Sequence, residues 1–160
     1  MIKEIRLAPK KIFNQMLKFM VVPTFDLVIE YGDQGVVVAY RKISPYKNVW
    51  ALPGLRMYKG ENIDDTLRRI AMQELGLKIN PKKKICLGQY VGKFKTDNKR
   101  QDLSSGYWIK VSDQQKIKLN TKHFTSYKII KKIPVKIGGM YKFYLKNYLK
   151  LRKEIKNKVK

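Results

Sequence analysis

Apolar side chains follow a helical period near the start of the chain and a strand-like pattern soon after it. From Ala8 to Met20 the apolar positions recur every three or four residues, which predicts an amphipathic helix within residues 1–20. Residues 21–31 and 36–40 are rich in β-branched and other apolar side chains, a composition typical of buried strands. The sequence Gly-Asp-Gln-Gly at 32–35 separates these two runs and indicates a hairpin turn.

A loop and a second amphipathic helix follow in the middle of the chain. Prolines and glycines interrupt residues 41–60, where only 50–52 have the apolar composition of a short strand. From Ile63 to Leu75 the apolar residues form one stripe at helical spacing, with two aspartates in the first turn. Gly76 then provides a typical helix stop.

The second half of the chain indicates further strands and a final helix. Residues 84–92 and 106–111 have strand-like composition and enclose a polar segment, 93–105, that we interpret as a loop. A weaker strand pattern covers residues 127–130. Lysines then alternate with aromatic and aliphatic residues at helical spacing, which predicts a basic C-terminal helix over residues 138–160.

The order and length of these elements predict the fold class. A chain of 160 residues suits one domain with a real hydrophobic core, and 44% hydrophobic residues exclude a disordered chain. A central helix flanked by strands favours an α/β (α+β) sandwich in which a mixed β-sheet is packed between helices. No internal repeat divides the sequence, so we expect residues 1–160 to form a single domain.

The composition is strongly basic. Lysine and arginine number 36 against 12 aspartates and glutamates, which gives a formal net charge of +24. Three interpretations stay open: a surface that attracts nucleic acid or an anionic membrane, a basic cleft for a polyphosphate substrate, or a general lysine bias of the lineage. The pattern of the C-terminal helix favours a packing face with a solvated back, and the helix could also lie on an anionic membrane or on nucleic acid.

A single cysteine, Cys86, rules out a disulfide within the chain and favours a reducing cytoplasm. Its apolar neighbours Ile85 and Leu87 predict a buried position. The N-terminus lacks the apolar core and small-residue cleavage site of a secretory signal, and no apolar run approaches the roughly 20 residues of a membrane span. We therefore expect a cytoplasmic protein.

Residues 53–77 carry a recognisable motif. The segment holds Glu61, Arg69 eight residues later, Glu74, and a closing Gly-Leu pair. It resembles the Nudix box, the loop-helix-loop that binds a metal-diphosphate in Nudix hydrolases. The spacing of Glu61 and Arg69 favours a structural pair that orients the loop and Glu74.

The segment also departs from the Nudix box. Leu55 stands where the box opens on a glycine, although Gly54 precedes it. Ile70 replaces the glutamate after the arginine, and Gln73 replaces the first glutamate of the closing pair. Two carboxylates that commonly hold magnesium in the family are therefore missing.

These losses are similar to those of one Nudix branch, the GDP-mannose mannosyl hydrolases, and the resemblance extends over roughly residues 5–130. It implies that Asp26 contacts the sugar and that His123, the one histidine of the chain, is the general base. The branch commonly forms homodimers. The resemblance also implies three contacts to the nucleotide diphosphate: Arg41, Arg56 and Tyr107.

A magnesium site is implied by the same resemblance. Glu74 and the carbonyl of Gly54 would be its protein ligands, completed by substrate phosphates and water. The residue before the histidine is a metal-binding glutamine in that branch, but here it is Lys122, whose ammonium is not a magnesium ligand. Either magnesium binds more weakly, or Lys122 takes over part of its task as a point charge on a phosphate, together with Arg41 and Arg56.

Purely structural interpretations stand beside these roles. Asp26 could be a buried polar partner within its strand, Tyr107 a core residue, and His123 a packing or surface residue. In so basic a chain, Arg41 and Arg56 could simply be solvated, and the side chain of Lys122 could point outward.

Three functions are consistent with the sequence. The first is hydrolysis of a nucleoside-diphosphate sugar of the GDP-mannose or GDP-glucose type, in which water attacks the anomeric carbon and releases GDP and sugar. The second is a Nudix pyrophosphohydrolase that cleaves another nucleoside diphosphate derivative at phosphorus, which the scarcity of carboxylates disfavours. The third is a catalytically impaired Nudix-like protein that binds a nucleotide or RNA, which Leu55, Gln73, Lys122 and the charge favour.

Overall fold

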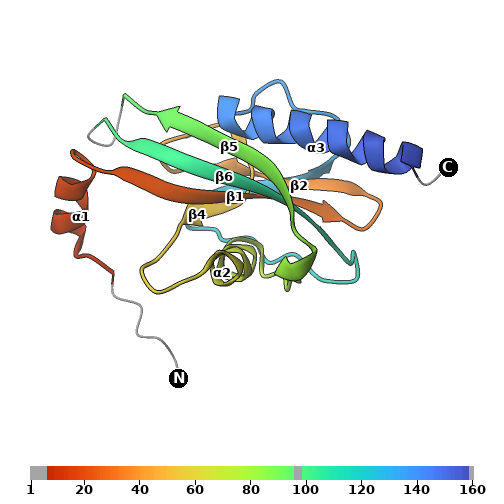
Figure 1. Ribbon diagram of the computed structural model, residues 1–160, viewed down its shortest axis with the longest axis horizontal. Coiled ribbons are helices and arrows are strands. Elements are labelled where there is room, and N and C mark those ends of the chain that lie inside the picture. Colours follow the sequence, from red (N-terminus) through yellow and green to blue (C-terminus); the bar gives the residue numbers. More distant parts are fainter. Residues whose placement is uncertain (1–6, 96–98, 159–160) are drawn as a thin grey trace.

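The computed structural model describes residues 7–95 and 99–158 of the chain (Figure 1). None of its helices is long and apolar enough to cross a membrane. In chain order, the described elements are α1 (Lys10–Met16), β1 (Val21–Tyr31), β2 (Gly35–Arg41), β3 (Trp50–Ala51), β4 (Gly54–Arg56), α2 (Ile63–Leu75), the 3-10 helix η1 (Pro81–Lys83), β5 (Ile85–Lys93), β6 (Gln101–Val111), β7 (Phe124–Ile130) and α3 (Gly139–Lys158).

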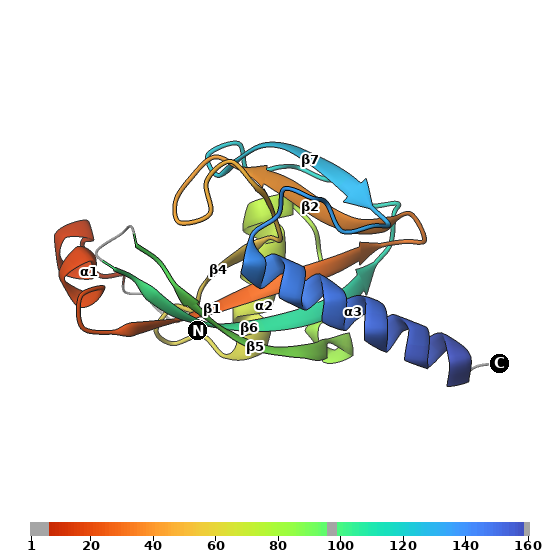
Figure 2. The same ribbon diagram turned by 90° about the horizontal axis from the view of Figure 1, so that it is seen from above.

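The strands form one mixed sheet (Figure 2). They follow the order β3-β2-β1-β6-β5, with β4 also paired to β1 and β7 to β2. β1 and β6 run parallel along their full length, from Val21 opposite Gln101 to Tyr31 opposite Val111. The other described strand pairs are antiparallel. β1 is therefore the central strand, and side chains from β4 and β6 lie beside it.

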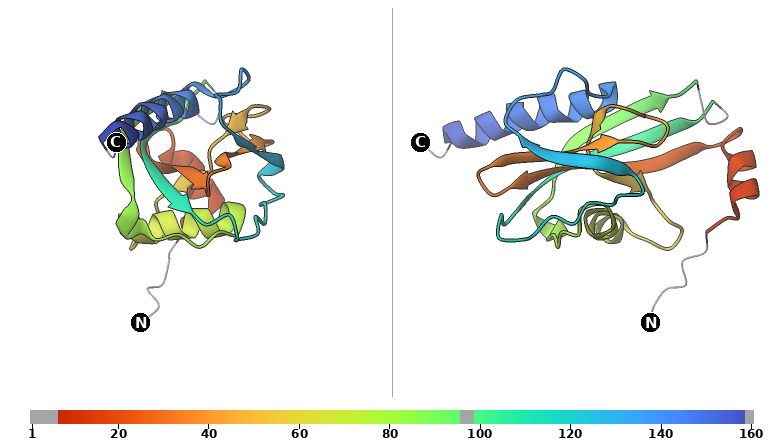
Figure 3. Two further views of the ribbon diagram at one scale, coloured as in Figure 1. Left: turned by 90° about the vertical axis from the view of Figure 1, so that its right-hand side faces the viewer. Right: turned by 180° about the vertical axis from the view of Figure 1, so that it is seen from behind.

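Helices cover both faces of this sheet, with α3 on one face and α2 on the other (Figures 1 and 3). Successive side chains of β1 point to opposite faces, so Val28 joins the buried cluster under α3 and Leu27 the cluster over α2. A strand buried on both faces has a nearly continuous apolar sequence, which is the pattern of residues 21–31. The predicted α/β sandwich of a mixed sheet between helices is confirmed.

Strand β6 begins earlier than the sequence pattern predicts. The polar composition of 93–105 predicts a loop, but residues 101–105 belong to β6. Asp102 and Ser104 are buried despite their polarity, and Ser104 accepts a hydrogen bond from Tyr144 of α3. Polar residues on a buried strand face hide the strand from composition, and they indicate a polar site at that face. Residues 96–98 of the predicted loop lie outside the described residues.

The N-terminal helix and the cysteine also differ from the predictions. α1 ends at Met16, because the amides of Lys18 and Phe19 bond to carbonyls three residues earlier and form a tight turn. Cys86 is exposed, because it lies on the edge strand β5, where alternate side chains face solvent. The parts of the two terminal predictions that fall on residues 1–6 and 159–160 lie outside the described residues.

Candidate functional site

A cavity of about 300 Å³ opens beside β1, on the face that α3 covers. Five residues singled out from the sequence line it, and they come from four separate segments of the chain: Asp26, Arg41, Gly54, Arg56 and His123. The fold, rather than local sequence, therefore brings them together. The remaining lining residues are Thr24, Ile43, Ser44, Pro45, Tyr46, Leu55, Tyr58, Phe94, Arg100, Asp102, Met140 and Tyr141.

Asp26 is buried on β1 and has a perturbed pKa. Its Oδ2 accepts a 2.5 Å hydrogen bond from the Ser104 hydroxyl, which in turn accepts a 2.9 Å hydrogen bond from Tyr144. Burial raises the pKa of Asp26 from 3.8 to about 7, although the hydrogen bond from Ser104 and the charge of Arg41 act in the opposite direction. Near neutral pH this carboxyl therefore populates both protonation states and can accept or donate a hydrogen bond.

Gly54 lies opposite Asp26 in the β1–β4 pairing. A Cβ at residue 54 would lie 2.1 Å from Oδ1 of Asp26, much closer than real Cβ atoms come to an oxygen. A glycine is therefore needed where the Pro-Gly turn brings the backbone against the cavity wall.

Arg41 and Arg56 are the two cavity-lining arginines that the sequence singled out. Arg41 is buried, and its Nε and Nη2 donate to the carbonyls of Ile43 and Ser44 at 3.0 and 2.9 Å. The guanidinium of Arg56 lies 3.8 Å from the centroid of the Phe13 ring, a cation–π contact that joins α1 to the site. Burial lowers the pKa of Arg56, but an arginine stays protonated at physiological pH. Arg41 and Arg56 thus supply two positioned cations to the cavity, which suits a diphosphate.

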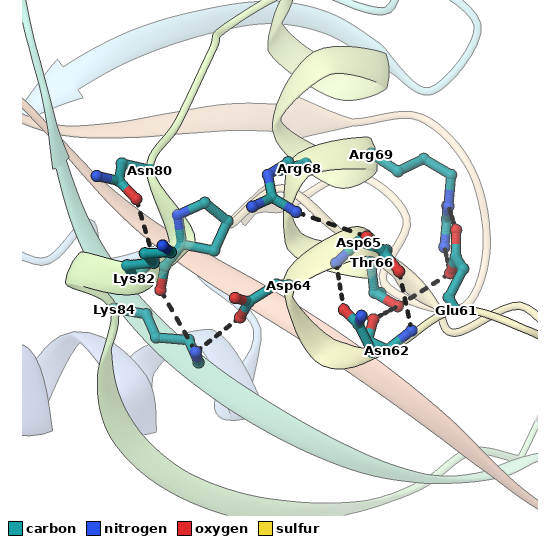
Figure 4. A network of polar contacts seen from close by, with 11 residues as sticks. Glu61, Asn62, Asp64, Asp65, Thr66, Arg68, Arg69, Asn80, Lys82 and Lys84 are labelled. Carbon is teal, nitrogen blue, oxygen red and sulfur yellow. Dashed lines mark hydrogen bonds and ion pairs between the residues drawn. The ribbon is translucent and has the colours of Figure 1, made fainter. Parts of the chain in front are cut away.

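Glu61, just before α2, and Arg69, in the middle of α2, form a largely buried ion pair (Figure 4). Arg69 Nη2 donates to Oε2 of Glu61 and to the carbonyl of Arg56, both at 2.8 Å. Burial alone would raise the pKa of Glu61, but hydrogen bonds from Arg69, the Tyr58 amide and the Thr66 hydroxyl hold it below its ordinary value. The pair therefore fastens the loop that carries Arg56 to the helix.

Local sequence fixes both ends of α2. The Asn62 side chain accepts a 2.9 Å bond from the amide of Asp65, whose carboxylate accepts a 3.3 Å bond from the amide of Asn62 (Figure 4). This reciprocal capping box satisfies two amides of the first turn. Gly76 ends the helix in the left-handed conformation, with φ of 65°. The helix thereby presents Glu74 at a fixed position in its last turn.

Glu74, His123 and Asn120 form a polar cluster at the edge of the cavity. Oε1 of the fully buried Glu74 lies 2.8 Å from Nδ1 of His123 and accepts a 2.9 Å hydrogen bond from the Asn120 amide. A neutral imidazole that donates its Nδ1–H to a carboxylate carries its free lone pair on Nε2. The cluster therefore orients the ring of His123, which lines the cavity, so that Nε2 can act as a base.

The donors present fit a magnesium ion that takes most of its ligands from substrate and water. Oε2 of Glu74 is buried and accepts no hydrogen bond from any described residue, so this oxygen lacks the partner that a cation would supply. Over residues 7–95 and 99–158, no three His, Cys, Asp or Glu side chains gather into a metal site. Magnesium commonly binds through one or two carboxylates plus phosphates and waters, so a single carboxylate is compatible with it.

Two residues singled out from the sequence lie away from the cavity lining. Tyr107 stacks on Phe25, with ring centroids 6.1 Å apart and planes 15° apart, and partial burial raises its pKa. The side chain of Lys122 is exposed, while its amide donates to Oδ1 of Asn120. The roles that the resemblance implies for Tyr107 and Lys122 stay predictions.

Sequence reasoning missed three polar residues of the site. Asn120 supports Glu74, and Arg100 and Asp102 line the cavity as an ion pair with 2.5 Å between Nε and Oδ1. The alternation of Asp102 and Ser104 within the segment taken as a loop is the pattern that indicates a polar strand face. Asn120 has no comparable sequence pattern, because its role depends on its distance from a helix far away in the chain.

Comparison with known proteins gives a family match. A family model described as NUDIX domain matches residues 20–131. The low-salt glycan biosynthesis protein Agl8 of Haloferax volcanii is 37% identical over 54 residues, a match that spans 34% of this chain and 34% of that protein. It therefore covers only about a third of either protein.

Solved structures share the fold. A MutT NUDIX hydrolase from Burkholderia pseudomallei has a TM-score of 0.69 at 15% identity, covering 80% of this chain and 98% of that chain. The NUDIX domain of Shewanella oneidensis NrtR, complexed with ADP ribose, has a TM-score of 0.63 at 16% identity, covering 92% of this chain and 94% of that chain. At such identities these likenesses bear on the fold alone.

Proposed function

The chain belongs to the NUDIX domain family, and on that premise we propose that it hydrolyses a nucleoside-diphosphate sugar of the GDP-mannose or GDP-glucose type. Water attacks the anomeric carbon, and the products are GDP and free sugar. The observation that carries this proposal is the imidazole of His123, which lines the cavity while its Nδ1 is engaged by Glu74. Its Nε2 is the atom left to accept a proton from water.

The cavity offers each part of such a substrate a matching group. Arg41 and Arg56 supply two positive charges for the diphosphate, which concentrates negative charge. Asp26, with its pKa raised to about 7, accepts or donates a hydrogen bond to a sugar hydroxyl. The proposal does not depend on Tyr107 or Lys122, which do not line the cavity.

The proposed reaction transfers one proton, forms one bond and breaks one bond. Nε2 of His123 takes a proton from water, the water oxygen bonds to the anomeric carbon, and the bond from that carbon to the diphosphate oxygen breaks. The leaving GDP keeps the electron pair, and Arg41 and Arg56 stabilise its charge. Glu74 stabilises the imidazolium that forms. Attack opposite the leaving group inverts the sugar carbon, as in an inverting glycosidase.

Glu74 and the carbonyl of Gly54 would hold magnesium together with substrate phosphate and water, and the bound ion would supply further positive charge to the leaving diphosphate. Lys122 offers an alternative, in which its ammonium replaces part of that charge. The variant Lys122→Gln should then require more magnesium or bind it more tightly. An unchanged magnesium dependence would reject this role of Lys122.

One comparison supports a sugar-related substrate. Agl8, which matches about a third of this chain, is described as a glycan biosynthesis protein. One observation favours a rival function: Leu55, Gln73 and Lys122 replace residues of the Nudix box and its magnesium site, as expected of a NUDIX protein that binds a nucleotide without hydrolysing it. Turnover separates the two proposals.

The test is release of GDP and free mannose from GDP-mannose by purified protein, with and without magnesium. We expect turnover by the wild type and a loss of about a hundredfold or more in His123→Gln, since a general base contributes on that order. Thr125→Ala, two residues away on an exposed position, is the control and should retain full activity. No turnover in either condition, with GDP still bound, would replace the hydrolase proposal by the binding protein.

A further inference from the structure

The cavity continues beyond the residues proposed to hold the sugar and the diphosphate. Strand register sets its order along β1, where Gly54 lies opposite Asp26 and Arg56 lies opposite Thr24. Asp102 of β6 lies opposite Val22, which is four residues before Asp26 on β1. At about 3.3 Å per residue, this places Asp102 roughly 13 Å from Asp26 along the strand. These positions alternate along the strand, so their side chains share the face on which the cavity opens. Asp102 thus lies at the opposite end of the cavity from Asp26 and Gly54.

An ion pair forms the wall at that far end. Arg100 donates through Nε to Oδ1 of Asp102 at 2.5 Å, and the two side chains are 18% and 5% exposed. This bond uses one of the five N–H donors of the guanidinium. Among the described residues no other partner of the Arg100 side chain is found, so its Nη groups are available to a ligand in the cavity.

A buried hydroxyl in the same wall lacks a hydrogen-bond partner. Thr24 is 6% exposed and lines the cavity, and its Oγ1 has no partner among the described residues. A buried hydroxyl left without a hydrogen bond costs free energy, so such a group in a cavity wall points to a ligand. Thr24 lies between the levels of Asp26 and Asp102, within the part of the cavity that a bound nucleotide would occupy.

Aromatic rings complete this end of the cavity. Tyr46 and Phe94 both line it and meet edge to face, with centroids 5.2 Å apart. Tyr141 also packs against Tyr46, at 5.0 Å between centroids. Flat aromatic faces beside charged hydrogen-bonding groups are the environment that proteins offer to nucleobases.

We propose that Arg100 and Asp102 read the nucleobase of the substrate and select guanine, with Tyr46 and Phe94 beside its ring. This inference rests on the proposed function, because it assigns the far end of the same cavity. It predicts that base, diphosphate and sugar lie in that order from Asp102 past Arg56 to Asp26.

Guanine satisfies this pair better than the other bases do. It presents two adjacent donors, N1–H and the 2-amino group, to the acceptor oxygens of a carboxylate. Its O6 accepts from an arginine, a common specific contact to this base. Adenine and cytosine each place a ring-nitrogen acceptor beside their amino group, and uracil places its N–H between two carbonyls. Each of these bases would therefore turn an acceptor toward Asp102, which is repulsive.

Calorimetric titration of the wild-type chain tests this selection without any turnover. Inosine diphosphate differs from GDP only in lacking the 2-amino group, so it should bind about tenfold or more weakly, and ADP and UDP more weakly still. Equal affinities for GDP, inosine diphosphate and ADP would overturn the inference, and this outcome needs no variant.

The variant Asp102→Asn should reverse the order of affinity for two nucleotides, a result that a merely structural role of Asp102 would not produce. Xanthosine diphosphate carries a carbonyl at C2, to which an asparagine amide can donate and which a carboxylate repels. The wild type should prefer GDP over xanthosine diphosphate by about tenfold or more, and the variant should reverse that order. A uniform loss of affinity for all nucleotides would assign Asp102 a structural role only and overturn the inference.

Two controls belong to this experiment. Asp33→Asn makes the same chemical change at an exposed carboxylate paired with Lys110, outside the cavity, and should keep the wild-type preference for GDP. Tyr46→Leu should weaken GDP and ADP by the same factor, because stacking does not distinguish the bases. A selective loss of GDP in Tyr46→Leu would contradict the division of roles.

The failures of the two proposals are distinguishable. Guanine selection and its reversal in Asp102→Asn, with no hydrolysis of GDP-mannose, would uphold the base-reading pair and reject the hydrolase. Hydrolysis of GDP-, ADP- and UDP-sugars at equal efficiency would uphold the hydrolase and reject the base-reading pair.

Discussion

Replacing the buried Asp26 by asparagine should change the pH dependence of stability. The pKa of this carboxyl is about 7 in the folded chain, mainly because of burial, against an ordinary value of 3.8. Between these values the folded state keeps a proton that the unfolded state releases. The free energy of unfolding of the wild type therefore falls as the pH rises from about 4 to about 7.

The size of this effect follows from the two pKa values. At about 1.36 kcal/mol per pKa unit, the move from 3.8 to about 7 corresponds to roughly 4 kcal/mol. Asp26 is only 3% exposed, so solvent screens little of it. Asparagine has nearly the same shape, its carbonyl can accept from Ser104, and it does not ionise. Asp26→Asn should therefore match the wild type near pH 4 and exceed its stability by roughly 4 kcal/mol near pH 8.

Urea unfolding followed by tryptophan fluorescence at pH 4, 5, 6, 7 and 8 measures this difference. Asp33→Asn is the matched control, because the hydrogen bond and charge of Lys110 hold the pKa of the exposed Asp33 below its ordinary value. Asp33 therefore titrates below this range, and its variant should run parallel to the wild type from pH 5 to 8. A curve for Asp26→Asn that also runs parallel would refute the raised pKa.

Three further substitutions test how the site is built. Arg69→Ala leaves the buried Glu61 without its partner and should cost about 3 kcal/mol of unfolding free energy, whereas Arg68→Ala, in a half-exposed pair, should cost under about 0.5 kcal/mol. Asn62→Ala removes the capping box and should cost about 1 kcal/mol by urea unfolding. Gly106→Ala places a Cβ 2.2 Å from the Tyr144 ring and should lower the free energy of unfolding by about 1–3 kcal/mol. An unchanged melting temperature would contradict this packing.

Local sequence predicts the parts of the fold whose determinants are neighbours in the chain. α2 begins and ends at the predicted residues, because its cap, its apolar stripe and its closing glycine all lie within 15 residues. β1 is predicted over its full length, because a strand buried on both faces is mostly apolar. The family motif between residues 53 and 77 likewise has its determinants in one segment.

The remainder depends on contacts that no local pattern carries. β6 begins in a segment of polar composition, because Asp102 lines the cavity and Ser104 is buried against Asp26 and Tyr144. The exposure of Cys86 follows from the position of β5 at the sheet edge, which requires the strand order. Asn120 joins the site only because the last turn of α2 lies beside it. The positions of these residues can be predicted only once the strand order and the contacts between distant segments are known.

Hydrolysis of GDP-mannose in water enriched in oxygen-18 tests the central claim most directly. Attack at the anomeric carbon, with His123 as base, places the label in the released mannose and none in GDP. Mass spectrometry of the two products measures this distribution. Label in a phosphate of the nucleotide product would instead mean cleavage at phosphorus, and it would contradict the mechanism proposed for this cavity.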